Sequence, residues 1–109
     1  MKKYIKVNEK PGTTHLKIEL YYALGGMNYF TGRTESRGYY LSVSPVERKG
    51  GCESYTSFTG TKILIKAVSR KSAKAEAEAE KIAAGEMENL IKYVCEKNNI
   101  PMENLEAIA

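Results

Sequence analysis

The chain has 109 residues and a formal net charge of +4, with 42% hydrophobic and 28% charged residues. This length suits one domain with one modest core, and the composition excludes a disordered chain. No apolar run approaches the roughly 18 residues that span a bilayer, and the first residues lack the apolar stretch of a signal peptide. We therefore expect a single domain over 1–109, a cytoplasmic location and no membrane partner.

The charge is divided unevenly along the chain. Residues 1–72 hold 13 Lys and Arg against 5 Glu, a net charge of +8, whereas residues 73–109 hold 4 Lys against 8 Glu, a net charge of −4. Such asymmetry bears on partners more than on fold. It makes the first part of the chain the place to look for contact with a polyanion.

The first 68 residues have the pattern of an antiparallel sheet. Between His15 and Leu24, apolar side chains alternate with Lys17, Glu19 and Tyr21, which is typical of a strand with one buried and one wet face. Pro45 indicates that a later strand ends there or lies at an edge. The expected strands are 4–7 at an edge, 15–24, 39–46, 54–59 and 61–68, the last of which also fits the front of a helix but is favoured as a strand by its β-rich Ile63-Leu64-Ile65.

A long polar segment, 25–38, joins two of these strands. Hairpin loops usually have about two to five residues, so this one is far longer than a turn requires. Met27, Tyr29 and Phe30 allow the strands to continue into a protruding arm; otherwise the segment is a long loop. In both cases it is the expected functional protrusion, because loops on a rigid scaffold often carry binding residues.

The last third predicts one long amphipathic helix over 69–98. Its apolar residues recur with a 3.6-residue period, Ser72 suits the N-cap, and Asn98-Asn99 with Pro101 ends it. Alanines line its first half, which predicts a close approach to a neighbouring element, and Cys95 falls on its apolar stripe. Segment 99–109 is a short final helix opened by Pro101 or a tail. The fold class is therefore α+β, with a sheet of three to four strands packed by one long C-terminal helix.

The chain offers little for catalysis. It has one His, no Asp, and two cysteines that form no CxxC pair. General acid–base work would fall to isolated glutamates, and no phosphate-binding or dinucleotide glycine motif can be drawn. We therefore predict no catalytic site, no metal site and no cofactor.

Aromatic and basic residues interleave in the first part of the chain, which favours nucleic-acid binding. Cations attract phosphate, and rings on a sheet or arm stack on bases at about 1–3 kcal/mol per base. Tyr21, Tyr40 and Tyr55 are expected on the wet face, and Arg70-Lys71 precede the helix, where cations oppose its macrodipole. Single-stranded DNA is the favoured partner, and the predicted contacts are Tyr29, Phe30, Arg33, Arg37, Tyr40, Arg48, Lys49, Arg70 and Lys71.

Two resemblances accompany this prediction. A strand-rich basic part followed by one long helix is similar in element order to the transcriptional-coactivator family of single-stranded-DNA binders, which implies a curved sheet and a dimerising helix. The run Gly-Tyr-Tyr-Leu-Ser-Val-Ser-Pro-Val-Glu-Arg (38–48) resembles short proteins of bacterial phages and integrative elements. That setting implies either handling of the element's DNA or inhibition of a host defence enzyme, as anti-CRISPR proteins do.

Two other partners stay open at the sequence level. A host effector protein with a basic groove would meet the acidic helix, whose glutamates include Glu76, Glu78, Glu80, Glu86 and Glu88. A second copy of the chain would meet the alanine-rich stretch of the same helix in a homodimer.

Overall fold

The computed structural model describes residues 1–55 and 60–106. Two neighbouring strands, in which core-facing and outward-facing side chains alternate, form the centre of the fold. Strand β2 (His15–Ala23) pairs antiparallel with β5 (Gly38–Lys49) along its whole length. The pairs Ile18–Val43 and Leu20–Leu41 fall on one face, while Lys17–Ser44 and Tyr21–Tyr40 fall on the other. The alternation predicted for β2 is confirmed, and it divides the sheet into a core face and an open face.

Three further strands complete a five-stranded antiparallel sheet. Strand β1 (Lys2–Lys6) pairs with β2 at the edge, as predicted. On the other side of β5, β7 (Thr61–Ala67) pairs with its first half and β6 (Cys52–Tyr55) with its last residues. The five strands overlap the five segments predicted as strands, and the sheet thus exceeds by one the upper end of the predicted three to four. The strand predicted at 54–59 lies partly outside the described residues, because its last four positions fall there.

The prediction that β5 ends at Pro45 or lies at an edge of the sheet is wrong. The strand does not end at this proline and is not an edge strand, because it continues to Lys49 in the middle of the sheet. The register explains how a central strand accommodates a residue without an N–H group. Pairing with β7 reaches Val43 and pairing with β6 starts at Val46, so Pro45 sits at the step between the two partners.

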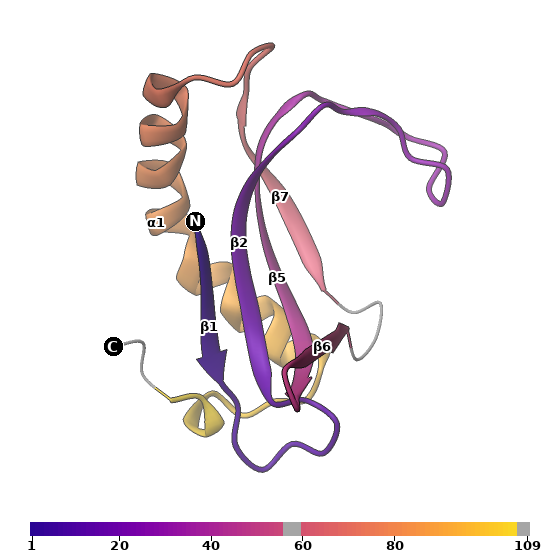
Figure 1. Ribbon diagram of the computed structural model, residues 1–109, viewed down its shortest axis with the longest axis vertical. Helices are drawn as coiled ribbons and strands as arrows, with labels where there is room; N and C mark the ends of the chain where they lie inside the picture. Colours follow the sequence, from indigo (N-terminus) through magenta and orange to yellow (C-terminus); the bar gives the residue numbers. More distant parts are fainter. Residues whose placement is uncertain (56–59, 107–109) are drawn as a thin grey trace.

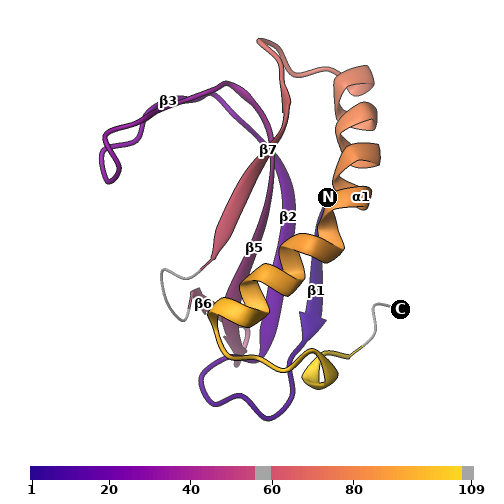
Figure 2. The same ribbon diagram turned by 180° about the vertical axis from the view of Figure 1, so that it is seen from behind.

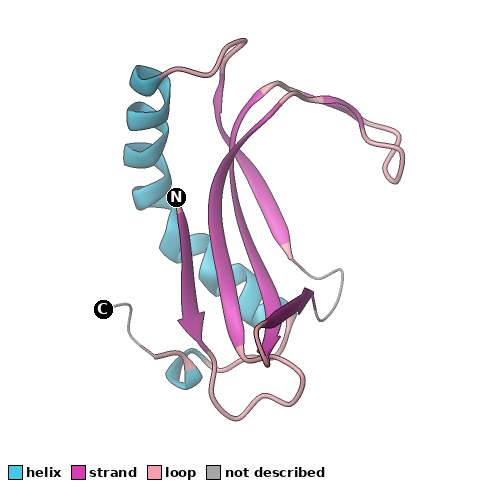
Figure 3. Ribbon diagram, viewed as in Figure 1, coloured by secondary structure: helices cyan, strands magenta, loops and turns pink. Residues whose placement is uncertain are grey.

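Helix α1 (Ala73–Lys97) covers the core face, with Ser72 as its N-cap accepting a hydrogen bond from the Ala75 N–H at 3.1 Å. Figure 3 shows the strands grouped together and the long helix beside them. The helix residues in the core are the three alanines of the first half and four larger residues of the second: Ala75, Ala79, Ala83, Leu90, Ile91, Val94 and Cys95. The predicted close approach of the alanines and the burial of Cys95 are confirmed. The surface that a homodimer through these alanines would use is already packed against the sheet.

Residues 101–106, the last described ones, return to the sheet and contain one short turn where a final helix or a tail was the prediction. A single 3-10 turn, η1 (Met102–Asn104), follows Pro101. Leu105 then forms a bridge with Val7, and the Glu106 N–H donates to the Lys6 carbonyl at 3.0 Å. Of the segment 99–109 predicted to be a final helix or a tail, positions 107–109 lie outside the described part.

Segment 25–38 is an ordered arm. Strands β3 (Gly26–Met27) and β4 (Thr34–Glu35) pair antiparallel as a separate two-stranded sheet. Figure 1 and Figure 2 show the arm leaving the sheet at the end where α1 begins and curving away from the helix. The prediction that the strands extend into a protruding arm is therefore confirmed.

Candidate functional site

The tip of the arm presents two aromatic rings to solvent. The Asn28 side-chain oxygen accepts hydrogen bonds from the Phe30 N–H at 2.9 Å and the Thr31 N–H at 3.2 Å, and the Gly32 N–H donates to the Asn28 carbonyl at 2.7 Å. An asparagine that bonds its own following backbone in this way closes a tight turn. Tyr29 and Phe30 occupy that turn and are 91% and 101% exposed.

An ion pair ties the arm to the open face of the sheet. The Glu35 carboxylate of β4 accepts from the Lys62 amine of β7 at 2.8 Å and from the Asn28 amide at 3.2 Å. The two hydrogen bonds hold the pKa of the Glu35 carboxyl below its ordinary value. The bond between Glu35 and Lys62 also raises the pKa of the Lys62 amine. We call Glu35, Lys62 and Asn28 the latch of the arm.

Backbone contacts at the base of the arm add to this anchoring. The Tyr40 hydroxyl donates to the Ser36 carbonyl at 2.6 Å, and the Arg37 Nε donates to the Leu24 carbonyl at 3.0 Å. Gly25 is needed here, because its φ is +74° and a Cβ atom would stand 2.6 Å from the Glu35 carbonyl oxygen. The arm is therefore a preorganised protrusion.

Tyr40, predicted to contact nucleic acid from the wet face, is on that face but only 5% exposed. Its ring stacks on Tyr21 with centroids 6.0 Å apart, and the Lys62 amine lies 5.2 Å from its centroid. Burial also raises the pKa of Tyr21. The ring of Tyr40 is thus a support for the arm in this conformation and offers no free face to a base.

Four exposed cations lie on the arm or on the loop next to its base. Arg33 and Arg37 belong to the arm, and Arg70 and Lys71 to the loop before α1; all four are exposed. The Val68 N–H donates to the Arg37 carbonyl at 3.1 Å, which joins this loop to the base of the arm. We call these four residues with Tyr29 and Phe30 the arm end.

Arg48 and Lys49, the remaining predicted contacts, lie at the opposite end of the sheet. Eleven steps of β5 separate Gly38 from Lys49, which is about 36 Å of extended chain. The nine predicted residues therefore do not form one surface. Seven are at or near the arm end, and these two lie at the turn between β5 and β6.

A second polar cluster on the open face lies near Arg48. Glu53 accepts from the Tyr4 hydroxyl at 2.6 Å and from the Lys17 amine at 2.9 Å, while the Arg48 guanidinium lies 4.1 Å from the Tyr4 ring centroid. The hydrogen bond to Glu53 raises the pKa values of both Tyr4 and Lys17 and lowers that of Glu53. The strand alternation placed Lys17 on this face, but no sequence signal paired it with Glu53.

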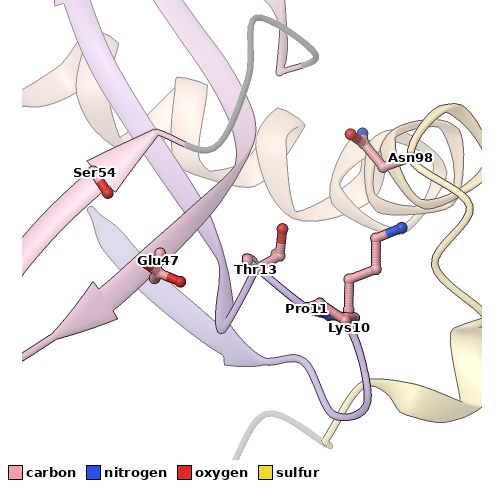
Figure 4. A pocket seen from close by; sticks show the side chains of 7 residues that line it. Lys10, Pro11, Thr13, Glu47, Ser54 and Asn98 are labelled. Carbon is pink, nitrogen blue, oxygen red and sulfur yellow. The ribbon is translucent and has the colours of Figure 1, made fainter.

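A polar pocket of about 430 Å³ lies beside this end of the sheet. Figure 4 shows the Lys10 amine and the Asn98 amide facing the same space. Its lining includes none of the residues predicted to bind nucleic acid, and consists of Lys10, Pro11, Gly12, Thr13, Glu47, Ser54 and Asn98. Lys10, a cation of the basic part of the chain, thus lies away from the arm.

Metal-ligating groups do not gather among residues 1–55 and 60–106, where no cluster of three His, Cys, Asp or Glu side chains is found. Within the same residues, no helix combines the length and the apolar character that a membrane span requires. Comparisons with protein-family models, curated proteins and solved structures gave no match to this chain. The resemblances in element order and in residues 38–48 therefore stay predictions.

Proposed function

We propose that the protein binds nucleic acid through the arm end, with single-stranded DNA as the preferred partner. The observation that carries the proposal is the arm tip, where two fully exposed rings are held on an ordered support. Exposed aromatic rings offer faces on which the bases of a single strand can stack. Tyr29 and Phe30 stack on bases, and the four cations of the arm end contact phosphates.

The ion pairs of the described residues favour the arm end over the flat open face. Lys17 and Arg48 share Glu53, and Lys62 approaches Glu35, so each of these open-face cations already has a carboxylate partner. Phosphate binding there would have to displace those partners. Arg33, whose carbonyl accepts from the Asn28 N–H of the tip turn, and Arg37 at the base of the arm are both exposed. Phosphate contacts are therefore concentrated near the arm.

Single strands suit this arrangement better than a duplex. The faces of bases in a duplex are covered by their neighbours, so insertion of Tyr29 or Phe30 would require unstacking at a cost of a few kcal/mol per step. A single strand exposes base faces without that cost. A role in a phage or mobile element is the prediction that accompanies this binding mode.

Fluorescence anisotropy with labelled oligo(dT) and a duplex of equal length tests the proposal. Four phosphate contacts give a slope of log K against log salt of about −3 for a single strand, since each contributes about −0.7. The double variant Tyr29→Ala with Phe30→Ala should weaken binding about five- to 150-fold per stacked base, because each stack contributes about 1–3 kcal/mol.

A matched control is available on the helix. Tyr93 is an exposed tyrosine of α1, away from the arm, so Tyr93→Ala should leave the affinity for oligo(dT) unchanged. Equal losses in Tyr93→Ala and in the arm variant would contradict a specific role for the arm tip. Tight binding that is insensitive to salt would contradict the phosphate contacts.

A further inference from the structure

An apolar groove lies between α1, the edge strand β1 and the C-terminal turn. It has a volume of about 350 Å³, within the range of pockets that accept small apolar groups. Its apolar lining comes from three separate parts of the chain and includes Ile5, Met87, Ile91, Met102 and Leu105. Glu88 and Glu106 also line the groove. The Glu106 carboxylate lies 3.9 Å from the Lys6 amine, so the acidic charge of the rim comes mainly from Glu88, which is outside the ion pairs of the described residues.

The walls of this groove are fixed by backbone contacts. Leu105 bridges to Val7, and the Glu106 N–H donates to the Lys6 carbonyl. Ile91 belongs to the buried core, while Met102 on the opposite wall is 42% exposed. The groove is therefore preformed, and an occupant pays little to open it.

The arm carries the complementary chemistry. Its exposed large apolar residues include Met27, Tyr29 and Phe30, and its cations are Arg33 and Arg37. An apolar tip flanked by positive charge matches an apolar groove flanked by carboxylates. The same division appears along the chain, since the arm belongs to the part with net charge +8 and the groove lies mainly in the part with −4.

We infer that the protein forms a two-fold dimer in which the arm of each copy docks into the apolar groove of the other. Two reciprocal contacts of this kind close the assembly, whereas a single contact repeated head to tail would not. This inference does not rest on nucleic-acid binding, because the groove lies outside the arm end.

The positions of the two features suit such a dimer. The arm leaves the sheet at Gly38, whereas Ile5 of the groove is aligned through Leu16 with Pro45, seven residues further along β5. That separation is about 23 Å along the strand, so arm and groove lie toward opposite ends of the sheet. They also lie on opposite sides, because the arm curves away from α1 (Figure 2). An antiparallel pair related by a two-fold axis brings each arm toward the other copy's groove.

Sedimentation equilibrium over a concentration series tests the dimer on the full chain. The mass should rise from 12.2 kDa toward twice that value as the concentration increases. Phe30→Ala removes the tip, and Met102→Gln makes one wall of the groove polar; each should weaken association at least tenfold. Circular dichroism melting establishes that both variants stay folded.

Ile82→Gln is the matched control for the groove variant. Ile82 is 44% exposed on α1, close to the 42% of Met102, but it does not line the groove. This variant should dimerise like the unchanged protein. Glu88→Lys should weaken the dimer as well, because it places a cation opposite the arginines of the arm.

Three results would overturn the inference. The first is a mass of 12.2 kDa at every concentration. The second is a dimer that Phe30→Ala and Met102→Gln leave unchanged, which would assign it to another surface. The third is equal weakening by Ile82→Gln. Since Met102→Gln leaves the arm intact, its binding to oligo(dT) reports on the proposed function separately.

Discussion

The latch predicts that Glu35→Gln loosens the arm without unfolding the domain. The Glu35 carboxylate accepts from Lys62 at 2.8 Å and from Asn28 at 3.2 Å, and both donors are held in place by other contacts. Glutamine keeps the shape of the side chain but loses its charge. The arm should therefore open from the sheet more often, while the core beneath α1 stays packed.

The size of the effect follows from exposure. The Lys62 and Glu35 side chains are 40% and 28% exposed, so their ion pair belongs in the surface range of about 0.2–1 kcal/mol. The weakened bond from Asn28 adds a fraction of the roughly 0.5–1.5 kcal/mol of an ordinary hydrogen bond. Together they give about 1 kcal/mol, which is about a fivefold rise in the open population.

Limited trypsin digestion measures that population. Cleavage after Arg37 requires the base of the arm to open, because its Nε is bonded to the Leu24 carbonyl and its carbonyl accepts from Val68. When opening is fast relative to cleavage, the rate tracks the open fraction, so it should rise about fivefold in Glu35→Gln. Glu80→Gln, on an exposed turn of α1, should leave it unchanged. An equal rate after Arg37 in Glu35→Gln and the unchanged protein would refute the latch.

Three further predictions follow from the core, the carboxylates and the shared arm. Leu41→Ala should lower the free energy of unfolding by about 2–5 kcal/mol in urea titrations, because Leu41 is fully buried on the core face. Glu35 and Glu53 have pKa values in the folded protein that are lower than their ordinary 4.5. Their ionised forms therefore stabilise the folded state above pH 4.5, and this stabilisation is lost as the pH falls through the folded-state pKa. The melting temperature should therefore drop between pH 6 and pH 3, a flat profile counting against both pairings. Excess oligo(dT) should convert dimers into monomers in sedimentation, because Tyr29 and Phe30 serve both contacts; an undiminished dimer peak with bound oligonucleotide would show that they do not compete.

The spacing of apolar residues predicted strand β2 and helix α1, because each buried side chain recurs at the period of its own strand or helix. Ile18 and Leu20 alternate with Lys17 and Glu19, and this local pattern placed β2 and its core face correctly. The stripe that ends in Val94 and Cys95 did the same for α1. Ile82 lies near that stripe by spacing yet is 44% exposed, because the buried face of this turn is formed by Ala79 and Ala83 and Ile82 lies to one side of them.

Features that depend on two distant segments were not predictable from the sequence. Pro45 predicts a strand end or an edge strand, because its actual position between the partners β6 and β7 depends on pairing across the sheet. Strand alternation predicts that Tyr40 is open on the wet face, whereas the Tyr21 ring and the Lys62 amine beside it come from two other strands. Glu35 and Lys62 carry no local signal of their ion pair. The sequence thus indicated which residues lie at the tip of the arm, but it did not indicate the contacts that orient them.

In the folded protein, ion pairs offset part of the uneven charge distribution seen along the sequence. Several cations of the basic part meet glutamates: Lys17 and Arg48 approach Glu53, and Lys66 of β7 pairs with Glu78 of the acidic helix at 2.9 Å. Such pairs contribute little stability when exposed, but they remove positive charge from the middle of the sheet. The cations outside the ion pairs of the described residues include Arg33, Arg37, Arg70 and Lys71. The proposed phosphate contacts therefore depend on these four cations of the arm end, which the net charge of +8 over the first 72 residues does not single out.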